Sequence, residues 1–337
     1  MKCLFFDHSF HRQTRSSDFF VSLLSDVYDV DVTYIDPDNP SINKELVDHA
    51  KRCEIVVFWQ IMPDAKLLIG LDLSKVVLIP MYDACCILSY RKWLEYKKCR
   101  FISFSKRMHN HLTAMGLKSF YLQYAPDVFS LKDDHKDIFP TIFIWKRTPN
   151  FNFKKLLPVL KKNGIKKAIC HGFKEEEKCE YQGMELEFTT GWFKDNADYF
   201  STLSRCHYFL APRQFVGIGM GFLEAMSQGL CVIAPNESTM NEYINKTNGV
   251  LFNSFGGIKI DLNSYVLMSN CARETIFALK EKWEKSAEDI ISYLQDDVLF
   301  PESRNFLMSS IIREELYQII HIRIRNFLRR HLGIQDY

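Results

Sequence analysis

The stretch that decides the fold is residues 214–252, which read QFVGIGMGFLEAMSQGLCVIAPNESTMNEYINKTNGVLF. It predicts a glycine loop, a short helix, a buried strand and a capped second helix. Alternate glycines from Gly217 to Gly221 leave room for backbone N–H groups to approach a ligand closely. Residues 222–226 are strong helix formers, and Gly229 ends that helix. A glycine loop that runs into a helix N-terminus suits an anionic ligand such as a diphosphate.

The second part of the stretch is a strand followed by a turn. Residues 230–234 form a continuous apolar run of strand length, as expected for a strand covered on both faces. Pro235 ends this run, and Asn248-Gly249 turns the chain into another apolar piece. Glycines that only make tight turns in an α/β domain would give the same short loop pattern. The spacing also differs from the G-x-G-x-x-G motif of dinucleotide-binding proteins.

The order of the whole stretch resembles the nucleotide-sugar signature of family-4 glycosyltransferases of the GT-B fold. That signature reads approximately E-G-F-G-L-P-x-L-E-A-M-A-x-G-x-P-V-I-A, followed by E-x-I-x-x-x-x-x-G-x-L. The matching residues are Gly217, Gly219, Leu223, Glu224, Ala225, Met226, Gly229, Val232, Ile233, Ala234, Glu242, Ile244, Gly249 and Leu251. The resemblance implies that Glu224 holds the ribose hydroxyls of the donor nucleotide, and that the loop Gly217-Ile218-Gly219-Met220 lies against the donor.

One position departs from the signature. The family carries a second acidic residue eight positions before the ribose-binding glutamate, where it contacts the donor sugar or lies close to it. Val216 stands there in this chain and offers neither a charge nor a hydrogen bond. The sequence therefore says more about the leaving nucleotide than about the sugar.

The resemblance implies an α/β fold of the GT-B type, with two Rossmann-like doubly wound domains facing across a cleft and a C-terminal helix crossing back. A length of 337 residues independently favours two domains, and the polar run at residues 130–137 marks the boundary. We expect an acceptor-binding domain at residues 1–128 and a donor-binding domain at 138–298. Residues 299–337 are expected to be helical and to pack on the first domain.

Composition limits the function classes. Hydrophobic residues make up 47% and charged residues 25%, which is typical of a soluble globular protein. A formal charge of +2 gives no case for nucleic-acid binding. Ten scattered cysteines without C-x-x-C pairs favour reduced thiols in a cytoplasmic protein and no metal site. We expect neither a signal peptide nor a membrane-spanning helix.

The first half offers candidates at the ends of two predicted strands. His8 and Arg15 belong to the loop after the first strand, and we predict that they bind the acceptor; a solvated loop of unpaired basic residues is the alternative. A helix from Asp18, capped by Ser16 or Ser17, should follow this loop. Tyr82 and Asp83 follow the fourth strand, at the edge where open α/β sheets bind ligands. Asp83 is a candidate catalytic residue and Tyr82 an acceptor contact, whereas the alternative role for Asp83 is a helix cap.

In the second half, basic residues are candidates for the donor diphosphate. The resemblance implies that Arg147, after the strand 141–145, and a lysine some residues later clamp the two phosphates, because a leaving dianion must be stabilised in the transition state. An arginine supplies a fork of donors and a lysine a point charge. Lys154 is our candidate, with Lys155 as the alternative, and solvated basic residues at a helix start would look the same. Gly191 and Trp192 resemble part of the family's F-x-G-W/Y loop, which implies that they lie near the nucleotide base. Arg213, just before the glycine loop, is predicted to be a further phosphate contact.

Histidines 109 and 111 are expected on the surface of a helix capped by Ser105. Towards the end of the chain, apolar residues recur at helical spacing from Leu316 and alternate with arginines. A basic amphipathic helix of this kind, over residues 321–334, can lie on an anionic membrane surface. The alternative is that its apolar stripe packs onto the protein.

Together these features predict a glycosyltransferase that moves a sugar from a nucleotide diphosphate sugar to a glycan or lipid-linked acceptor. The resemblance implies retention of anomeric configuration without a metal or other cofactor, in synthesis of a bacterial surface polysaccharide such as lipopolysaccharide, O-antigen or capsule. It would act in the cytoplasm, at the inner face of the membrane. Two alternatives stay open: a non-catalytic GT-B protein that binds a nucleotide or glycan, and a sugar-nucleotide epimerase.

Overall fold

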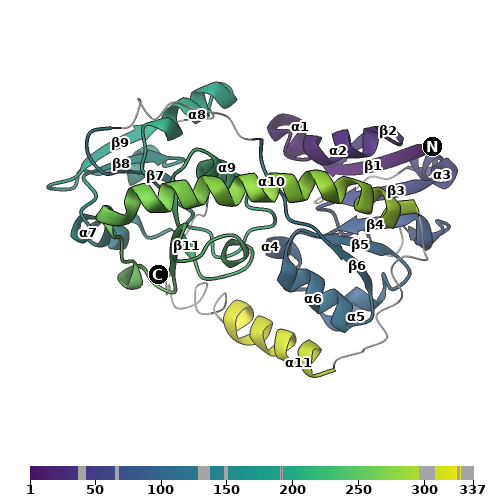
Figure 1. The fold of residues 1–337 in the computed structure, drawn as a ribbon. Helices are drawn as coiled ribbons and strands as arrows, with labels where there is room; N and C mark the ends of the chain where they lie inside the picture. Colours follow the sequence, from purple (N-terminus) through teal and green to yellow (C-terminus); the bar gives the residue numbers. More distant parts are fainter. Residues whose placement is uncertain are drawn as a thin grey trace. The chain divides into compact units, whose positions relative to one another are not determined.

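The structure is a computed structural model that describes residues 1–36, 43–64, 68–127, 137–147, 151–189, 191, 193–295, 308–324 and 327. The chain divides into two compact units. The first contains Met1–Gln123 and Trp283–Arg325, and the second contains Tyr124–Lys282. Each unit is built on its own parallel sheet (Figure 1).

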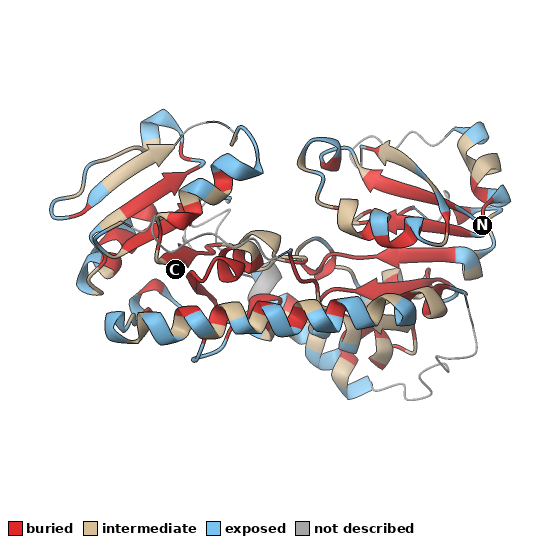
Figure 2. Ribbon diagram, turned by 45° about the horizontal axis from the view of Figure 1, so that its top comes forward, coloured by how far each residue is buried: buried red, intermediate tan, exposed pale blue. Residues whose placement is uncertain are grey.

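The sheet of the first unit has six parallel strands in the order β2-β1-β3-β4-β5-β6. They are β1 (Lys2–His8), β2 (Asp29–Ile35), β3 (Ile55–Trp59), β4 (Val76–Ile79), β5 (Arg100–Ser103) and β6 (Lys118–Tyr121). The central strands are apolar along their length and buried (Figure 2), as expected when helices cover both faces of a parallel sheet.

The helices of the first unit follow from local sequence signals. They are α1 (His11–Thr14), α2 (Asp18–Ser25), α3 (Lys44–Arg52), α4 (Tyr82–Cys85), α5 (Tyr90–Leu94), α6 (Lys106–Ala114) and α11 (Met308–Tyr317), which continues as a π-helix, η8 (Gln318–Ile324). Ser105 accepts a hydrogen bond from the backbone N–H of Met108 and caps α6, as predicted. Asn43 caps α3 through the N–H of Leu46. No described helix is both long and apolar enough to cross a bilayer.

The sheet of the second unit has six parallel strands in the order β12-β11-β10-β7-β8-β9. They are β7 (Thr141–Trp145), β8 (Lys167–His171), β9 (Glu185–Thr189), β10 (Tyr208–Leu210), β11 (Cys231–Pro235) and β12 (Gly249–Phe252). Its helices are α7 (Phe153–Lys162), α8 (Asn196–Ser204), α9 (Met220–Ser227) and the 31-residue α10 (Tyr265–Gln295).

Helix α10 contributes to both units, because the boundary between them falls within it, after Lys282. In the second unit, Ser269 donates a hydrogen bond to the carbonyl oxygen of Gly229 at 2.6 Å. In the first unit, Trp283 packs edge-on against Phe19 at 5.4 Å between ring centroids. The hydroxyl of Tyr293 bonds the backbone of Phe101 there.

Three local predictions are wrong. The second helix of the stretch 214–252 is only a 3-10 turn, η5 (Met240–Glu242). The reason is that Asn248 holds the chain in turns, accepting from the N–H of Asn245 and donating to the carbonyl oxygen of Tyr243. Ser17 stands at the N-cap of α2, but its hydroxyl donates to Asp7 instead of capping. His111 is buried rather than on the surface, because it faces α11.

Gly229, just after α9, has φ +74°, and a Cβ atom there would lie 2.6 Å from Nε of Arg273 and 2.7 Å from Oγ of Ser269. We therefore expect Gly229→Ala to lower the free energy of unfolding by about 2–4 kcal/mol, since a left-handed backbone and steric overlap act together. Chemical denaturation measures this. Gly256→Ala is the matched control, because a Cβ atom there meets nothing within 4 Å. Equal losses in the two variants would contradict the argument.

Candidate active site

The strand order of the second unit brings the candidate donor residues to one edge. The chain runs outward from β7 through β8 and β9, then returns to β10 on the other side of β7. In open α/β sheets, ligands bind beyond the carboxyl ends of the strands at such a switch point. Arg147 follows the carboxyl end of β7, and Arg213 with the glycine loop follows that of β10. The fold therefore brings these segments, far apart in sequence, to neighbouring positions.

The glycine loop has a backbone that other residues adopt poorly. Gly219 is the N-cap of α9 and has φ +84°, and a Cβ atom there would overlap the ring of Phe222 at 2.0 Å. The hydroxyl of Thr239, which is fully buried, lies 3.0 Å from the carbonyl oxygen of Val216 and 2.9 Å from that of Gly217. Thr239 thus ties the loop down while the loop runs into the N-terminus of α9, where anions bind favourably.

Glu224 lies one turn into α9 and is partly buried. Burial raises the pKa of its carboxyl from an ordinary value near 4.5 to about 7, against the opposing effects of a hydrogen bond from Tyr199 and the charge of Arg147. Burial also raises the pKa of Tyr199, with the Glu224 charge as the second cause. The three side chains therefore interact although they come from α9, α8 and the end of β7. Perturbation of this kind, at the ligand-binding edge of a sheet, is typical of functional sites.

Tyr199, the hydrogen-bond partner of this carboxyl, belongs to a cluster of aromatic side chains. Trp145, the last residue of β7, lies 5.5 Å from Tyr199 and 5.4 Å from His171 between ring centroids. His171 stacks on Phe193 at 4.2 Å, and its Nδ1 lies 2.8 Å from the hydroxyl of Thr189. Burial lowers the pKa of His171, and the charge of Arg147 lowers it further, which favours a neutral ring. Flat apolar surfaces beside a cation and a carboxylate suit a heterocyclic base and its sugar.

Arg147 and Lys146 are adjacent but have different surroundings. The ammonium of Lys146 pairs with Glu177 and is buried. The guanidinium of Arg147 instead lies 4.7 Å from the centre of the Trp145 ring, and the residue is exposed. Arg147 is therefore the better placed of the two to meet a phosphate. The charge of Arg147 lowers the pKa of both Glu224 and Tyr199, so Arg147 acts on the same group of side chains.

The other donor candidates are placed less completely. Lys154 and Lys155 are both exposed in the first turn of α7, so the choice between them stays open. Gly191 is exposed with φ +77°, while Trp192 lies outside the described residues. Arg213 is partly buried just before the glycine loop. Within the loop, the Ile218 side chain is buried, which leaves its backbone as the group available to a ligand.

In the first unit, the loop after β1 is organised by a buried carboxylate. Asp7 is fully buried and receives hydrogen bonds from the N–H of His8, from Ser17 Oγ at 2.5 Å and from His11 Nδ1 at 2.6 Å. His8 is partly exposed, and its Nδ1 accepts from the N–H of Phe10. Arg15 is exposed and pairs with Asp18 at 2.5 Å. The loop is therefore a bonded turn, and the alternative of unpaired basic residues is wrong for Arg15.

Tyr82 and Asp83 start the short helix α4, directly past the end of β4. Tyr82 is only 2% exposed, and its hydroxyl donates to Glu314 of α11 at 3.4 Å. This placement does not support Tyr82 as an acceptor contact, because packing against α11 occupies its side chain. Asp83 is half-buried in the first turn of α4, whose N-cap is Met81. Asp83 is therefore not the N-cap, and the capping alternative is wrong.

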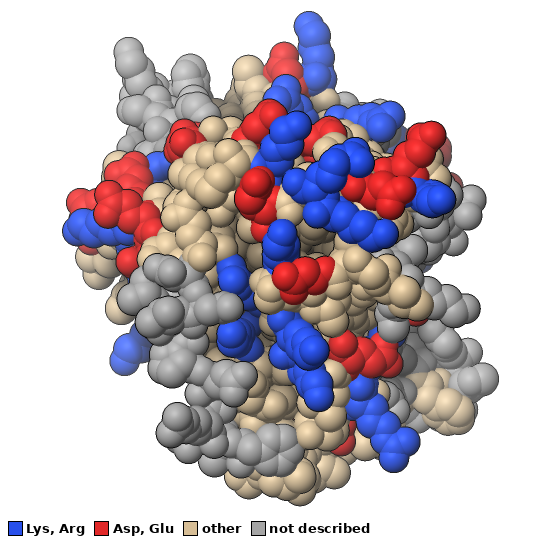
Figure 3. All heavy atoms as spheres, turned by 90° about the vertical axis from the view of Figure 1, so that its right-hand side faces the viewer, with Lys and Arg blue, Asp and Glu red and all other residues tan. Residues whose placement is uncertain are grey.

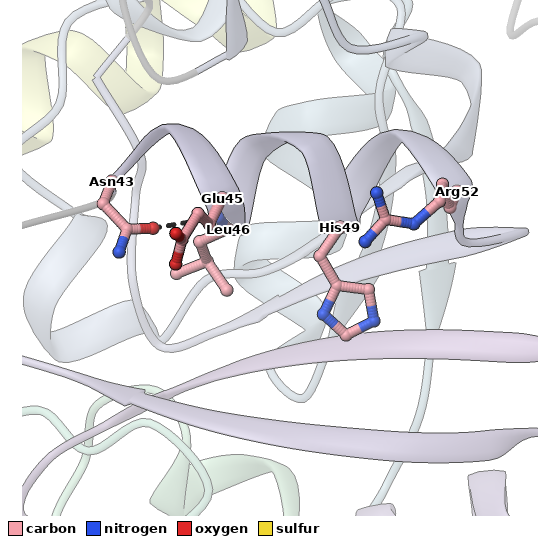
Figure 4. Close-up of a pocket in the computed structure, with 5 residues that line it drawn as sticks. All are labelled: Asn43, Glu45, Leu46, His49 and Arg52. Carbon is pink, nitrogen blue, oxygen red and sulfur yellow. Dashed lines mark hydrogen bonds between the residues drawn. The ribbon is translucent and has the colours of Figure 1, made fainter.

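The remaining surface gives no competing site among the described residues. No group of three His, Cys, Asp or Glu side chains there could hold a metal ion. The face in Figure 3 carries basic and acidic side chains next to one another rather than a field of one sign. A depression of about 400 Å³ is lined by Asn43, Glu45, Leu46, His49 and Arg52, all from α3 or its cap (Figure 4). Because all five residues come from a single helix and its cap, they cannot enclose a ligand from several sides. Glu224, Tyr199 and Arg147, in contrast, come from three different elements.

Several residues of the cluster were not predicted from the sequence. From the sequence we predict no role for Tyr199, Trp145, Phe193 or Thr239. Only the pairing of strands brings such residues together. Trp145 on β7, for example, pairs with His171 on β8, which lies 26 positions later in the sequence. The one sequence signal for Trp145 is its position at the carboxyl end of a predicted strand, where open α/β sheets bind ligands.

Comparison with known proteins supports the fold. No protein-family profile matches the chain, and no curated protein matches its sequence. Among solved structures, HepE of Anabaena with UDP and glucose aligns with a TM-score of 0.56 and 15% identity over 87% of this chain and 100% of that chain. The lipopolysaccharide outer core galactosyltransferase WaaB aligns with 0.60 and 14% over 86% and 100%. A DNA-modifying β-glucosyltransferase aligns with 0.55 and 12% over 88% and 100%. The chain has the GT-B glycosyltransferase fold, as predicted.

The raised pKa of Glu224 predicts a pH-dependent stability. The pKa of Glu224 in the folded chain, about 7, exceeds the ordinary value near 4.5. The carboxyl therefore does not destabilise the fold below pH 4.5, where it is protonated in both states, and its destabilising effect is complete above pH 7. Relative to the native chain, Glu224→Gln should therefore gain about 2–3 kcal/mol of unfolding free energy between pH 5 and pH 8. Denaturant titrations at the two pH values measure this.

Glu187→Gln is the control of opposite sign. A hydrogen bond from Arg205 lowers the pKa of Glu187 to about 2, so its charge contributes stability above the ordinary pKa. This variant should be less stable than the native chain at pH 8. A pH-independent difference for Glu224→Gln would show that the carboxyl is not perturbed.

Proposed function

We propose that the protein transfers a sugar from a nucleotide diphosphate sugar to a glycan or lipid-linked acceptor. The observation that carries this proposal is the Glu224 carboxyl, whose pKa is raised by burial and lowered by a hydrogen bond from Tyr199 and by the charge of Arg147. It lies in the helix that follows the glycine loop fixed by Thr239. Glu224 would accept hydrogen bonds from the ribose hydroxyls. The N–H groups of the loop and the start of α9 would receive the diphosphate.

The same residues account for the chemistry of transfer. As the bond between the sugar and the diphosphate breaks, its electron pair moves to the phosphate oxygen, and Arg147 and Lys154 would stabilise that charge. The acceptor hydroxyl attacks the anomeric carbon, and its proton passes to the departing phosphate. Asp83, past the end of β4, would contact the acceptor or the donor sugar. The signature resemblance implies retention of configuration; a product anomer measured by NMR decides this.

The nucleotide and the acceptor are proposed with unequal support. Solved structures of similar fold include a complex with UDP and glucose, so UDP is our first candidate nucleotide. Their acceptors differ, since one is named for lipopolysaccharide and another for DNA modification, and a shared fold does not transfer an acceptor. We propose a growing surface polysaccharide as the acceptor, with the protein in the cytoplasm at the inner face of the membrane.

Two alternatives make different predictions. A non-catalytic GT-B protein would bind the nucleotide but would lack the slow donor hydrolysis expected of a transferase; Val216 in place of an acidic residue favours it. A sugar-nucleotide epimerase would interconvert free sugar nucleotides without an acceptor. Incubation of the protein with the donor alone, followed by separation of products, distinguishes the three.

The donor site predicts selective nucleotide binding. In a thermal-shift screen of UDP, GDP, ADP, TDP and CMP, one nucleoside diphosphate should raise the melting temperature. Glu224→Ala should weaken that binding by about 1–3 kcal/mol, because charge-assisted hydrogen bonds are lost. If no nucleotide stabilises the native chain, the donor site is assigned wrongly.

Arg147 predicts an effect on turnover. We expect Arg147→Ala to lower kcat by roughly 100-fold or more while the nucleotide affinity changes less, because the leaving charge develops in the transition state. Steady-state kinetics with the donor selected by the screen measures both quantities. Lys259→Ala removes an exposed positive charge elsewhere in the unit and should leave turnover unchanged. Unchanged turnover in Arg147→Ala would disprove the phosphate clamp.

A further inference from the structure

Helix α11 docks on the first unit through its two acidic residues. Nε of Arg107 lies 3.0 Å and 3.2 Å from the two carboxylate oxygens of Glu314. Arg107 also lies 3.5 Å from the centre of the Tyr317 ring. Glu315 accepts a hydrogen bond from the backbone N–H of Tyr90 at 3.0 Å. Helix α11 thus lies beside α6 (Figure 1), and both of its carboxylates are already hydrogen-bonded.

The imidazole of His111 lies in this contact without a hydrogen bond. His111 follows Arg107 by four positions on α6, so the two side chains share the face of α6 that meets α11. His111 is only 7% exposed. Within the described part of the chain, neither of its ring nitrogens has a hydrogen-bond partner. Buried polar groups almost always have partners, and an apolar side chain would fill the same space without this cost, so packing alone does not account for a histidine here.

The charged and titratable groups around His111 come from three helices. Glu314 and Glu315 face it from α11, and Arg107 lies on its own helix. Tyr82 of α4 reaches the same contact through its hydrogen bond to Glu314, and burial raises the pKa of that phenol, so it stays neutral. Burial lowers the pKa of His111 from its ordinary value of 6.5; the two carboxylates oppose this shift, and the charge of Arg107 adds to it. The imidazole is therefore neutral at pH 7 while α11 is docked.

We propose that α11 is a proton-sensitive strap on the first unit: it stays docked on α6 while His111 is neutral and is released when His111 takes up a proton. Protonation places an uncompensated charge in the contact, because Arg107 and the N–H of Tyr90 already hold the two neighbouring carboxylates. Release would uncover Tyr82, which is 2% exposed and follows β4 at the ligand-binding edge of the first sheet. Acidification would thus change access to that edge.

The direction of the pH dependence follows from these protonation states. His111 binds a proton more tightly after release, where it has its ordinary pKa of 6.5, than in the docked state, where its pKa is lower. The docked state is therefore fully favoured above pH 6.5. Below that value, it loses up to about tenfold in population relative to the released state for each pH unit.

Hydrogen exchange of the full chain, read by mass spectrometry, measures the release of α11. After correction for intrinsic exchange rates, the protection of residues 308–317 should fall by up to about tenfold between pH 7.5 and pH 5.5. His111→Phe and His111→Gln cannot take up this proton, so each should show the same protection of α11 at both pH values. If one substitution disturbs the packing and removes the protection altogether, the other variant decides.

The matched control is His109→Gln. His109 lies on the same helix, but its Nδ1 lies 3.1 Å from Oγ of Ser119 on β6, so this variant should keep the native pH dependence of α11. Helix α7 in the second unit should show no comparable change in protection. Equal protection of residues 308–317 at both pH values in the native chain, or the native fall in His111→Phe and His111→Gln, overturns the proposal. These measurements use no nucleotide, so their failure does not count against the donor site.

Discussion

The reversal of strand order between β7 and β10 is the constraint on which the candidate site depends. Parallel strands linked by right-handed crossovers leave one place where neighbouring loops diverge, and ligands enter there. In this chain that place receives Arg147 from one strand and the glycine loop from the other. Glu224 follows one turn later in α9. The strand order thus determines where the site lies, and the individual side chains determine what it can bind.

Burial of Glu224 has an energetic meaning in this arrangement. A carboxyl whose pKa is raised to about 7 is destabilising when charged, and a chain selected for stability alone would carry a neutral residue. Tyr199 and Arg147 offset only part of that cost, since the pKa stays high. Ribose hydroxyls would donate hydrogen bonds to the ionised carboxyl, so a bound nucleotide would offset this cost. Stability given up at a functional site is a recognised trade-off.

Much of the fold was predictable from sequence, because it rests on local patterns. The strand 141–145 ends at the predicted residue, since apolar runs and their breakers are local signals. The turn around Met240 was mistaken for a helix, because Asn248 satisfies backbone groups that a helix would have used. The interaction of Glu224 with Tyr199 was not predictable, because the two residues come from different helices and meet only through packing on the sheet. Tyr82 follows a strand as a ligand contact would, but its hydroxyl bonds Glu314 of α11, a contact between residues too far apart in the sequence to predict.

The most direct measurement is calorimetric titration of the nucleoside diphosphate at pH 7 in two buffers of different ionisation enthalpy. If the nucleotide requires an ionised Glu224 with a pKa of about 7, binding should release about half a proton from that carboxyl. The difference between the native chain and Glu224→Gln isolates this proton from those of the phosphates. Tight binding with the same proton count in both proteins would contradict the account, because the ribose would then not be held by Glu224.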